Sequence, residues 1–184
     1  IIREKTGTTM NPSGFNALEM ALEIKEKLGE EEPCEIIAIT MGPSSAEEEL
    51  RTAIAMGVDE GCLLTDRCFA GGDTIATART LAKGIEALGG VDLVIAGAES
   101  SDGATGQVGP MLAEAMGIPQ AILVQRIESV KKDEIEVVKK FRQASVRLKM
   151  RLPAVITTVY GSNEPRLTTL RSRMAAKKKE LKIF

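Results

Sequence analysis

The sequence contains no histidine and no tryptophan among its 184 residues, and aromatic residues make up 3% of it. Without an imidazole, the Ser-His-Asp and Cys-His nucleophilic arrangements and most transition-metal sites are excluded. The few aromatic side chains leave little for bases to stack on, so we expect no single-stranded nucleic-acid platform. Any chemistry in which the protein takes part is therefore expected to come from a bound group rather than from its own side chains.

Cysteines are few, and long apolar runs are missing. The number of cysteines is odd, and none of the three, Cys34, Cys62 and Cys68, belongs to a Cys-x-x-Cys pair. This pattern indicates a reducing compartment and thiols that fill the core. No apolar stretch approaches the roughly 18 residues that a membrane span needs, and no charged-then-apolar leader is visible. We therefore expect one soluble domain over residues 1–184, in the cytoplasm of a bacterium or archaeon rather than in a mitochondrial matrix.

Each end of the chain is poor in charge of one sign. Residues 1–60 carry 5 basic and 13 acidic side chains, whereas residues 126–184 carry 16 basic and 6 acidic ones, although the net charge of the whole is −2. A solvated surface, a surface that docks a partner protein and a nucleic-acid contact can each produce such an asymmetry. The first two are favoured, and no nucleic-acid partner is expected.

Helical and strand patterns alternate along the first two thirds of the chain. Apolar residues at helical spacing are followed by short β-branched runs, and Ser44 with Glu47 is a predicted capping box. Such alternation predicts βαβ units and therefore an α/β fold. We expect a three-layer domain with a parallel sheet as the core over residues 1–119. The expected helices are 14–27, 44–57, 74–88 and 107–116, and the expected strands are 35–41, 62–65 and 91–96.

After Pro119 the hydrophobic pattern changes to period two. Lys131-Lys132-Asp133 is a polar turn between alternating segments, which predicts antiparallel hairpin strands over residues 120–160, the last of them 153–159. Residues 161–184 are expected to form a partner loop and an exposed basic arm that carries three consecutive lysines, 177–179.

Candidate binding residues follow the predicted strands, where glycine-rich turns meet helix N-termini. The segment 97–109 is the richest, because its glycines permit close backbone approach and its hydroxyls can hold phosphate. Composition alone does not distinguish such a pocket from a surface loop, and neither common nucleotide-binding glycine motif is present. Thr74 and Thr77 would face one ligand, whereas Asp73 is interpreted first as a helix N-cap. No carboxylate pair has the geometry of a catalytic acid and base, so no catalytic residue is assigned.

Several short motifs occur in the order found in a known family, and they extend over nearly the whole chain. They are Asn11-Pro12, Ala55-Met56-Gly57-Val58-Asp59, Gly72-Asp73-Thr74 with Ala76-Thr77, Asp102-Gly103 with Thr105-Gly106-Gln107-Val108-Gly109-Pro110, and Asn163-Glu164-Pro165-Arg166 ahead of Ala176-Lys177-Lys178-Lys179. Each motif is weak alone, but the co-linear set is specific. It resembles the β subunit of electron transfer flavoprotein.

The resemblance implies a heterodimer with an α subunit, which carries electrons between an acyl-CoA dehydrogenase-type flavoenzyme and a redox acceptor. The α subunit would hold most of the redox FAD. This chain would contribute a Rossmann-like domain, of the adenine nucleotide α-hydrolase-like type. It would bind AMP or, as in members that bifurcate electrons from NADH, a second FAD. The Asp73, Thr74 and Thr77 turn is similar to the version associated with the second flavin and favours FAD. Carried over by position, the cofactor-binding residues would be Asn11, Pro12, Met41, Asp73, Thr74, Thr77, Gly97, Asp102, Gly103, Thr105, Gly106, Gln107 and Val108. The partner-binding residues would be Ser162, Asn163, Glu164 and Pro165.

The sequence departs from the family pattern at several positions. Ala98 and Glu99 stand where a basic residue and a glutamine are usual, and Ser162 stands where many members carry a leucine. These changes bear on how ligand phosphates are balanced and on which dehydrogenase is served. The opening strand of the family is expected to precede Ile1.

A second hypothesis of another class remains open from the residues. A non-redox adenine-nucleotide-binding sensor module of the stress-protein type has a similar three-layer architecture and needs no α subunit. In either case the chain is expected to be a carrier or binding module rather than a stand-alone catalyst.

Overall fold

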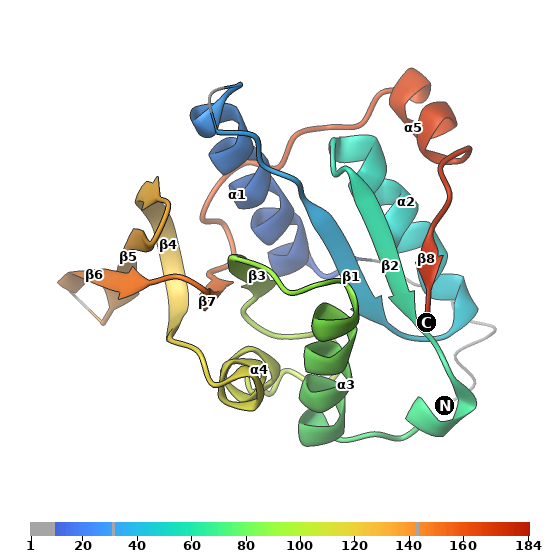
Figure 1. Cartoon of the computed structure of the whole chain (residues 1–184), viewed down its shortest axis with the longest axis horizontal. Coiled ribbons are helices and arrows are strands. Elements are labelled where there is room, and N and C mark those ends of the chain that lie inside the picture. The colour runs from blue at the N-terminus through green and yellow to red at the C-terminus, as the bar shows by residue number, and fades with distance from the viewer. Residues whose placement is uncertain (1–9, 31, 143) are drawn as a thin grey trace.

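The computed structural model describes residues 10–30, 32–142 and 144–184 and shows a layered α/β fold (Figure 1). The elements are α1 (Pro12–Leu28), β1 (Ile37–Met41), α2 (Glu47–Met56), β2 (Glu60–Leu64), α3 (Thr74–Ala87), β3 (Leu93–Gly97), α4 (Val108–Met116), β4 (Gln120–Lys131), β5 (Glu134–Phe141), β6 (Ala144–Arg151), β7 (Ala154–Thr158), α5 (Leu170–Ala176) and β8 (Lys182–Ile183). Helices pack directly on the parallel strands, α1 on β3, α2 on β2 and α4 on β7. The predicted Rossmann-like α/β class is confirmed.

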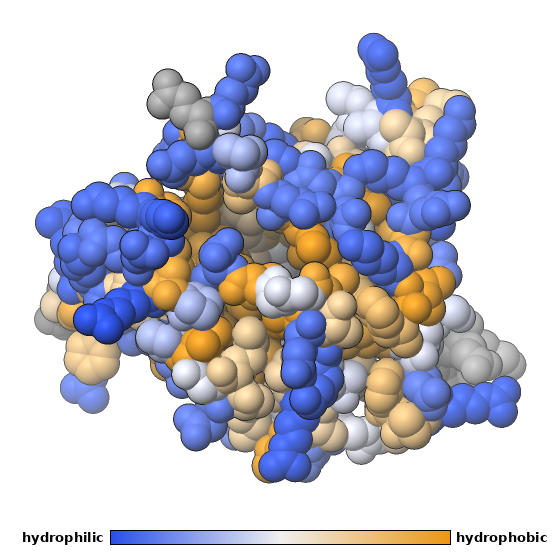
Figure 2. All heavy atoms as spheres, viewed as in Figure 1, coloured by the Kyte–Doolittle hydropathy of each residue, from blue (hydrophilic) through white to orange (hydrophobic). Residues whose placement is uncertain are grey.

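The strands form two sheets, in the orders β1-β2-β8 and β3-β7-β4-β5-β6. All residues of β7 are buried, whereas every residue of β1 and β3 is only half-buried. Among the described strands no pairing joins β1 to β3, so each keeps one edge without a sheet neighbour. Apolar side chains accordingly reach the surface over the middle of the molecule (Figure 2).

The antiparallel extension is confirmed for three strands and wrong for the fourth. β4 pairs antiparallel with β5, and β5 with β6, as the alternating pattern predicted. β7 is instead a parallel strand between β3 and β4, with Leu93 opposite Ala154. Its apolar residues are buried on both faces of the sheet. Such burial is typical of a parallel strand rather than of a hairpin strand with one solvent-exposed face. The face over β4 to β6 is largely hydrophilic (Figure 2).

The C-terminal segment was predicted to be an exposed arm, and this is wrong for its backbone. Ala176 of α5 is buried in a cluster with Ile54 and Ala55 of α2, and β8 extends the first sheet beside β2. The guanidinium of Arg51 donates to the carbonyl oxygens of Ala176 and Lys177, each at 3.1 Å. A cation at a helix C-terminus satisfies carbonyls that the helix leaves unpaired. The side chains of the three lysines that follow α5 do remain exposed.

The predicted capping box at the second helix is also wrong. Residues Ser44–Ala46 form a turn of 3₁₀ helix, and α2 begins at Glu47 without a side-chain cap. A capping box occurs instead at α5, where Thr169 and Ser172 exchange side-chain and backbone hydrogen bonds. The same local chemistry thus serves a helix that the sequence pattern did not predict.

All three cysteines are free thiols. Cys62 is buried in the core, Cys34 is half-buried and Cys68 is exposed, so the predicted core role is confirmed for Cys62 and wrong for Cys68. Within residues 10–30, 32–142 and 144–184, no helix is long and apolar enough to cross a membrane. Over the same ranges, no group of three or more acidic or cysteine side chains is placed to hold a metal ion.

Candidate functional site

The first part of the candidate nucleotide site joins the N-terminus of α1 to the end of β3. Asn11 is the N-cap of α1, and Pro12 is its first residue. The Asn11 amide and the Ser13 hydroxyl both donate to the carbonyl oxygen of Glu99, the latter at 3.2 Å. A side chain at Gly97 would place its Cβ 2.5 Å from Ser13 Oγ, so only glycine permits this close approach. The sequence-predicted residues Asn11, Pro12 and Gly97 therefore lie together.

The loop after β3 folds back on itself with hydrogen bonds of its own. The amide of Gly103 donates to Asp102 Oδ1 at 2.7 Å, and the amide of Ala104 donates to the Ser100 carbonyl at 3.0 Å. Gly106 has φ +63°, in the left-handed region that favours glycine. These contacts order a stretch that composition alone did not distinguish from an irregular surface loop.

The N-terminus of α4 is the part of the site best suited to an anion. Gln107 stands at the N-cap position, but its side chain makes no capping bond and instead accepts a hydrogen bond from Thr74 Oγ1 at 3.1 Å. Thr105 Oγ1 accepts from the Gln107 amide. The first amides of the helix, at Val108 and Gly109, thus have no side-chain cap. Uncapped amides at the positive end of a helix dipole are a common phosphate site.

The start of α3 lies beside this anion site through the Thr74 and Gln107 contact. Asp73 is the N-cap of α3 and accepts a hydrogen bond from the Ala76 amide at 2.8 Å, which confirms the N-cap interpretation. The hydroxyl of Thr77 donates to the Asp73 carbonyl at 2.9 Å. Thr74 therefore reaches across to the neighbouring loop, whereas Thr77 bonds its own helix.

Met41 is the remaining predicted ligand residue, and it is the half-buried last residue of β1. A surface hollow of about 420 Å³ lies elsewhere, between α3 and the chain end at Phe184. Its lining includes Phe69, Arg79 and Lys83 but none of the predicted nucleotide residues. This hollow is therefore separate from the candidate nucleotide site.

The donor set of the candidate site fits a phosphate group through backbone amides and hydroxyls rather than through cations. None of the thirteen predicted cofactor residues is a lysine or an arginine, and the loops also carry the acidic side chains of Asp73, Glu99 and Asp102. A phosphate here would be held by the amides at the start of α4 and by the threonine hydroxyls beside them. Gly97 and Gly106 let the backbone approach such a ligand closely.

The four predicted partner-binding residues do not all face outward. The hydroxyl of Ser162 is buried and lacks a hydrogen-bond partner among the described residues. The Asn163 side chain turns inward, where its amide donates to the Asn16 carbonyl at 3.0 Å. Glu164 is exposed, and Pro165 is half-buried. The partner role of these residues stays a prediction.

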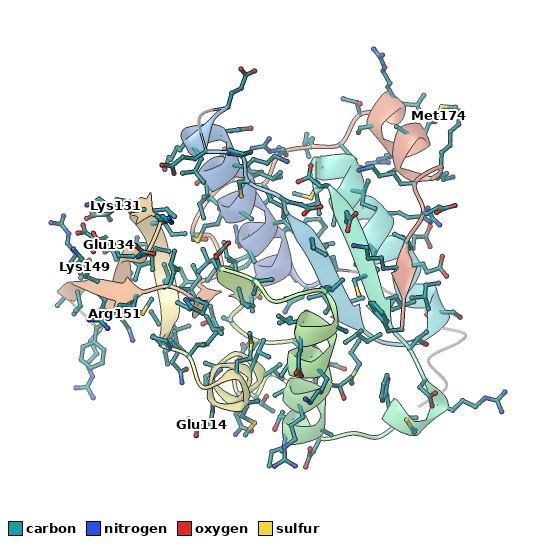
Figure 3. The ribbon with its side chains drawn as sticks, in the orientation of Figure 1. Glu114, Lys131, Glu134, Lys149, Arg151 and Met174 are labelled. Carbon is teal, nitrogen blue, oxygen red and sulfur yellow. The ribbon has the colours of Figure 1, made fainter. Side chains whose placement is uncertain are left out.

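The structure adds an exposed apolar surface that the sequence analysis missed. We call Leu167, Leu170 and Met174 the docking face; Leu167 is 94% exposed and Leu170 is 76% exposed. Leu170 and Met174 are four apart on α5 and so share one side of the helix, and Met174 projects outward (Figure 3). Exposed cations surround them, at Arg171, Arg173, Lys177 and Lys178. Apolar residues spaced four apart within the basic segment were the available sequence signal.

Comparison with known proteins gives the family of the chain. The chain matches the Electron transfer flavoprotein domain over residues 1–184. It is 41% identical to the electron transfer flavoprotein subunit beta of Thermoanaerobacterium thermosaccharolyticum, covering 100% of this chain and 69% of that protein. It is 40% identical to the caffeyl-CoA reductase-Etf complex subunit CarD of Acetobacterium woodii, with 100% and 69% covered. Protein FixA of Bradyrhizobium diazoefficiens is 40% identical, with 90% and 58% covered.

The fold and the loop geometry define a Rossmann-like α/β chain with an antiparallel extension. The matches just given show that the chain belongs to the electron transfer flavoprotein family and corresponds to its β subunit. An electron transfer role follows from that membership, and the resemblance carried by the co-linear motifs is confirmed.

Proposed function

We propose that this chain is the nucleotide-binding β subunit of a heterodimeric electron transfer flavoprotein, in which it holds FAD or AMP at the loops after β3. The uncapped N-terminus of α4 beside Thr74 and Thr105 carries the proposal. The amides at Val108 and Gly109 would bind the phosphates, and Asn11 and Ser13 would fix the loop that leads to them. A bound flavin would supply the one- and two-electron chemistry that the side chains lack.

The second-flavin version is favoured over AMP because the Asp73, Thr74 and Thr77 turn is similar to the version associated with the second flavin, and Thr74 of this turn contacts Gln107 beside the anion site. The amides at Val108 and Gly109, with Thr74 and Thr105 beside them, would hold the phosphates of such a flavin, and its ring would supply the capacity to accept a hydride from NADH. The relatives named as a caffeyl-CoA reductase-Etf complex subunit and as an acryloyl-CoA reductase electron transfer subunit are compatible with this version. With few aromatic residues in the chain, an isoalloxazine ring would be held by aliphatic side chains, backbone groups or the α subunit.

The proposed partners are the α subunit and an acyl-CoA dehydrogenase-type flavoenzyme. The docking face with its cationic surround suits a flavoenzyme surface that is acidic and has an apolar recess at its centre. Such a surface gains affinity from the buried leucines and association rate from the charges.

One experiment tests the nucleotide proposal directly. The chain is co-expressed with its α subunit, and flavin and AMP are counted per heterodimer, with an absorbance spectrum before and after NADH. Two FAD and bleaching by NADH support the bifurcating version. One FAD with one AMP rejects the second flavin but keeps the β-subunit role. A heterodimer whose β side holds no nucleotide rejects the proposal.

The sensor hypothesis is distinguished by the state of the chain expressed alone. A stable homodimer loaded with AMP or ATP on size exclusion supports a sensor module. Aggregation that co-expression of the α subunit reverses supports the flavoprotein. The family membership favours the second result.

A further inference from the structure

A polar stripe on α1 is buried under the segment between β7 and α5. Asn16 is 3% exposed and Glu19 is 6% exposed, although an amphipathic helix would be expected to turn such residues toward water. The covering segment leaves β7, runs along α1 and continues to α5 (Figure 1). At the end of β7, Thr158 Oγ1 donates to the Ser13 carbonyl at 3.2 Å, and hydrogen bonds then join the covering segment to α1 along the next turns of the helix.

Asn16 uses both ends of its amide on this segment. Its Nδ2 donates to the Asn163 carbonyl at 2.9 Å and to Asn163 Oδ1 at 2.7 Å. Its Oδ1 accepts from the amide of Gly161 at 3.0 Å. Asn163 returns a bond from its own amide to the Asn16 carbonyl. This reciprocal set fixes both the position and the orientation of residues 161–163.

Glu19 fixes the next point, at Arg166. The carboxylate accepts from the Arg166 amide at 2.9 Å and from the guanidinium at 2.8 Å. Nη1 of the same guanidinium donates a hydrogen bond to Glu26 Oε1 at 2.6 Å. Bidentate arginine contacts of this kind specify geometry as well as energy. Hydrogen bonds from Arg166 hold the pKa of Glu19 below its ordinary value, so the carboxylate is charged when the segment is held.

The docking face begins immediately after this clamp. Leu167 follows Arg166, and the capping box at Thr169 starts α5 two residues later. The place of Leu167 and Leu170 is thus determined by α1 on one side and by the packing of α5 on the other. A segment ordered before docking loses less conformational entropy when it binds.

We propose that Asn16 and Glu19 are positioning residues that hold residues 161–166 on α1 so that Leu167 and Leu170 meet the partner flavoenzyme in a fixed place. This inference rests on the proposed function. In this proposal the two residues would contact neither the flavoenzyme nor a cofactor and would act through Asn163 and Arg166. Because α1 also binds the loop after β3 through Asn11 and Ser13, one helix supports both the nucleotide loop and the docking face.

The test uses the purified heterodimer and three variants of nearly constant volume. Asn16→Asp removes the amide donor, Glu19→Gln removes the charge, and Arg166→Lys keeps the charge but loses the forked geometry. Glu86→Gln is the matched control, because Glu86 pairs with Lys83 on the exposed surface of α3. Electron transfer is measured with a short-chain acyl-CoA dehydrogenase reduced by butyryl-CoA, with the dehydrogenase concentration varied. Hydrogen exchange is followed at the amides of Gly161 and Arg166.

We expect KM for the dehydrogenase to rise about three- to tenfold in all three variants, with kcat and nucleotide content unchanged. The two amides should exchange faster, while those of β7 should not change. An unchanged KM despite faster exchange, a fall in kcat alone, or an equal effect in the control overturns the inference. So does failure of all three variants to assemble, because the role is then in folding. If the unmodified heterodimer carries no nucleotide or passes no electrons, the proposed function itself fails.

Discussion

The carboxylate of Glu19 lies 2.8 Å from Nη2 of Arg166, a residue 147 positions further along the chain. The pair joins the first described helix to the segment that leads into the last one. Its carboxylate is nearly buried, whereas the guanidinium is 33% exposed. Removing one partner of such a pair leaves the other without its counter-charge.

Glu19→Gln is expected to lower the free energy of unfolding by about 1–3 kcal/mol at neutral pH. The pKa of Glu19 is lowered in the folded state, chiefly by the hydrogen bonds from Arg166. The contribution of the Glu19 carboxylate to the free energy of unfolding is therefore fully present above the ordinary glutamate pKa. It is lost as the pH falls through the lowered pKa of the folded state. Urea unfolding at a series of pH values should show that the difference in free energy of unfolding between the unmodified protein and the variant becomes smaller over that range. A difference that stays constant with pH would contradict this assignment.

Gly97→Ala is expected to displace α1 from the end of β3. The added Cβ would lie 2.5 Å from Ser13 Oγ and 3.1 Å from the Gly14 amide nitrogen, which overpacks the junction by about 1–3 kcal/mol. Nucleotide content should fall with stability. Gly14→Ala is the control, because its Cβ would make an ordinary 3.4 Å contact and alanine favours the helix by up to about 1 kcal/mol. If the Gly97→Ala variant keeps its full nucleotide content, the assignment of this junction to the nucleotide site is wrong.

Thr74→Val is expected to weaken nucleotide binding more than Thr77→Val does. The Thr74 hydroxyl bonds Gln107 across the site, whereas that of Thr77 bonds the Asp73 carbonyl within its own helix. Loss of one hydrogen bond of about 1 kcal/mol corresponds to a roughly fivefold weaker affinity. Calorimetric titration of the nucleotide-stripped heterodimer measures both. Equal losses would favour two threonines facing one ligand, as the sequence alone predicted.

Leu170→Ser and Leu167→Ser are expected to weaken docking of the acyl-CoA dehydrogenase without unfolding the protein. Both side chains are mostly exposed, so the change in stability should stay within about 0.5 kcal/mol. The surrounding cations should also make docking weaker at high salt. Phe141→Ser is the control, since Phe141 is 57% exposed on the antiparallel extension. Surface plasmon resonance in a salt series measures the effect, and loss of binding in Phe141→Ser alone would move the docking surface to that extension.

The elements of the core were predictable because their signals are local. The helices 14–27, 74–88 and 107–116 were predicted within a few residues of α1, α3 and α4, since amphipathic spacing and closing glycines act within one or two turns. β7 was misassigned because its neighbours in the sheet are decided by strands far away in the sequence. The exposed arm was predicted from the run of lysines after α5. That run contains no information about Arg51, which lies on α2 and binds the carbonyl oxygens at the end of α5.

The sequence by itself determined the α/β class and the family, because these depend on short patterns and on motif order. The loops in which a nucleotide would bind stay a prediction from the same motifs. Only the tertiary structure decided which polar side chains are buried and which apolar ones are exposed. Asn16 and Glu19 belong to a helix face that looks solvated until the segment after β7 covers it, and Leu167 looks like an ordinary core residue until its surroundings are known. Burial is a property of contacts between distant segments, and local spacing carries no record of them.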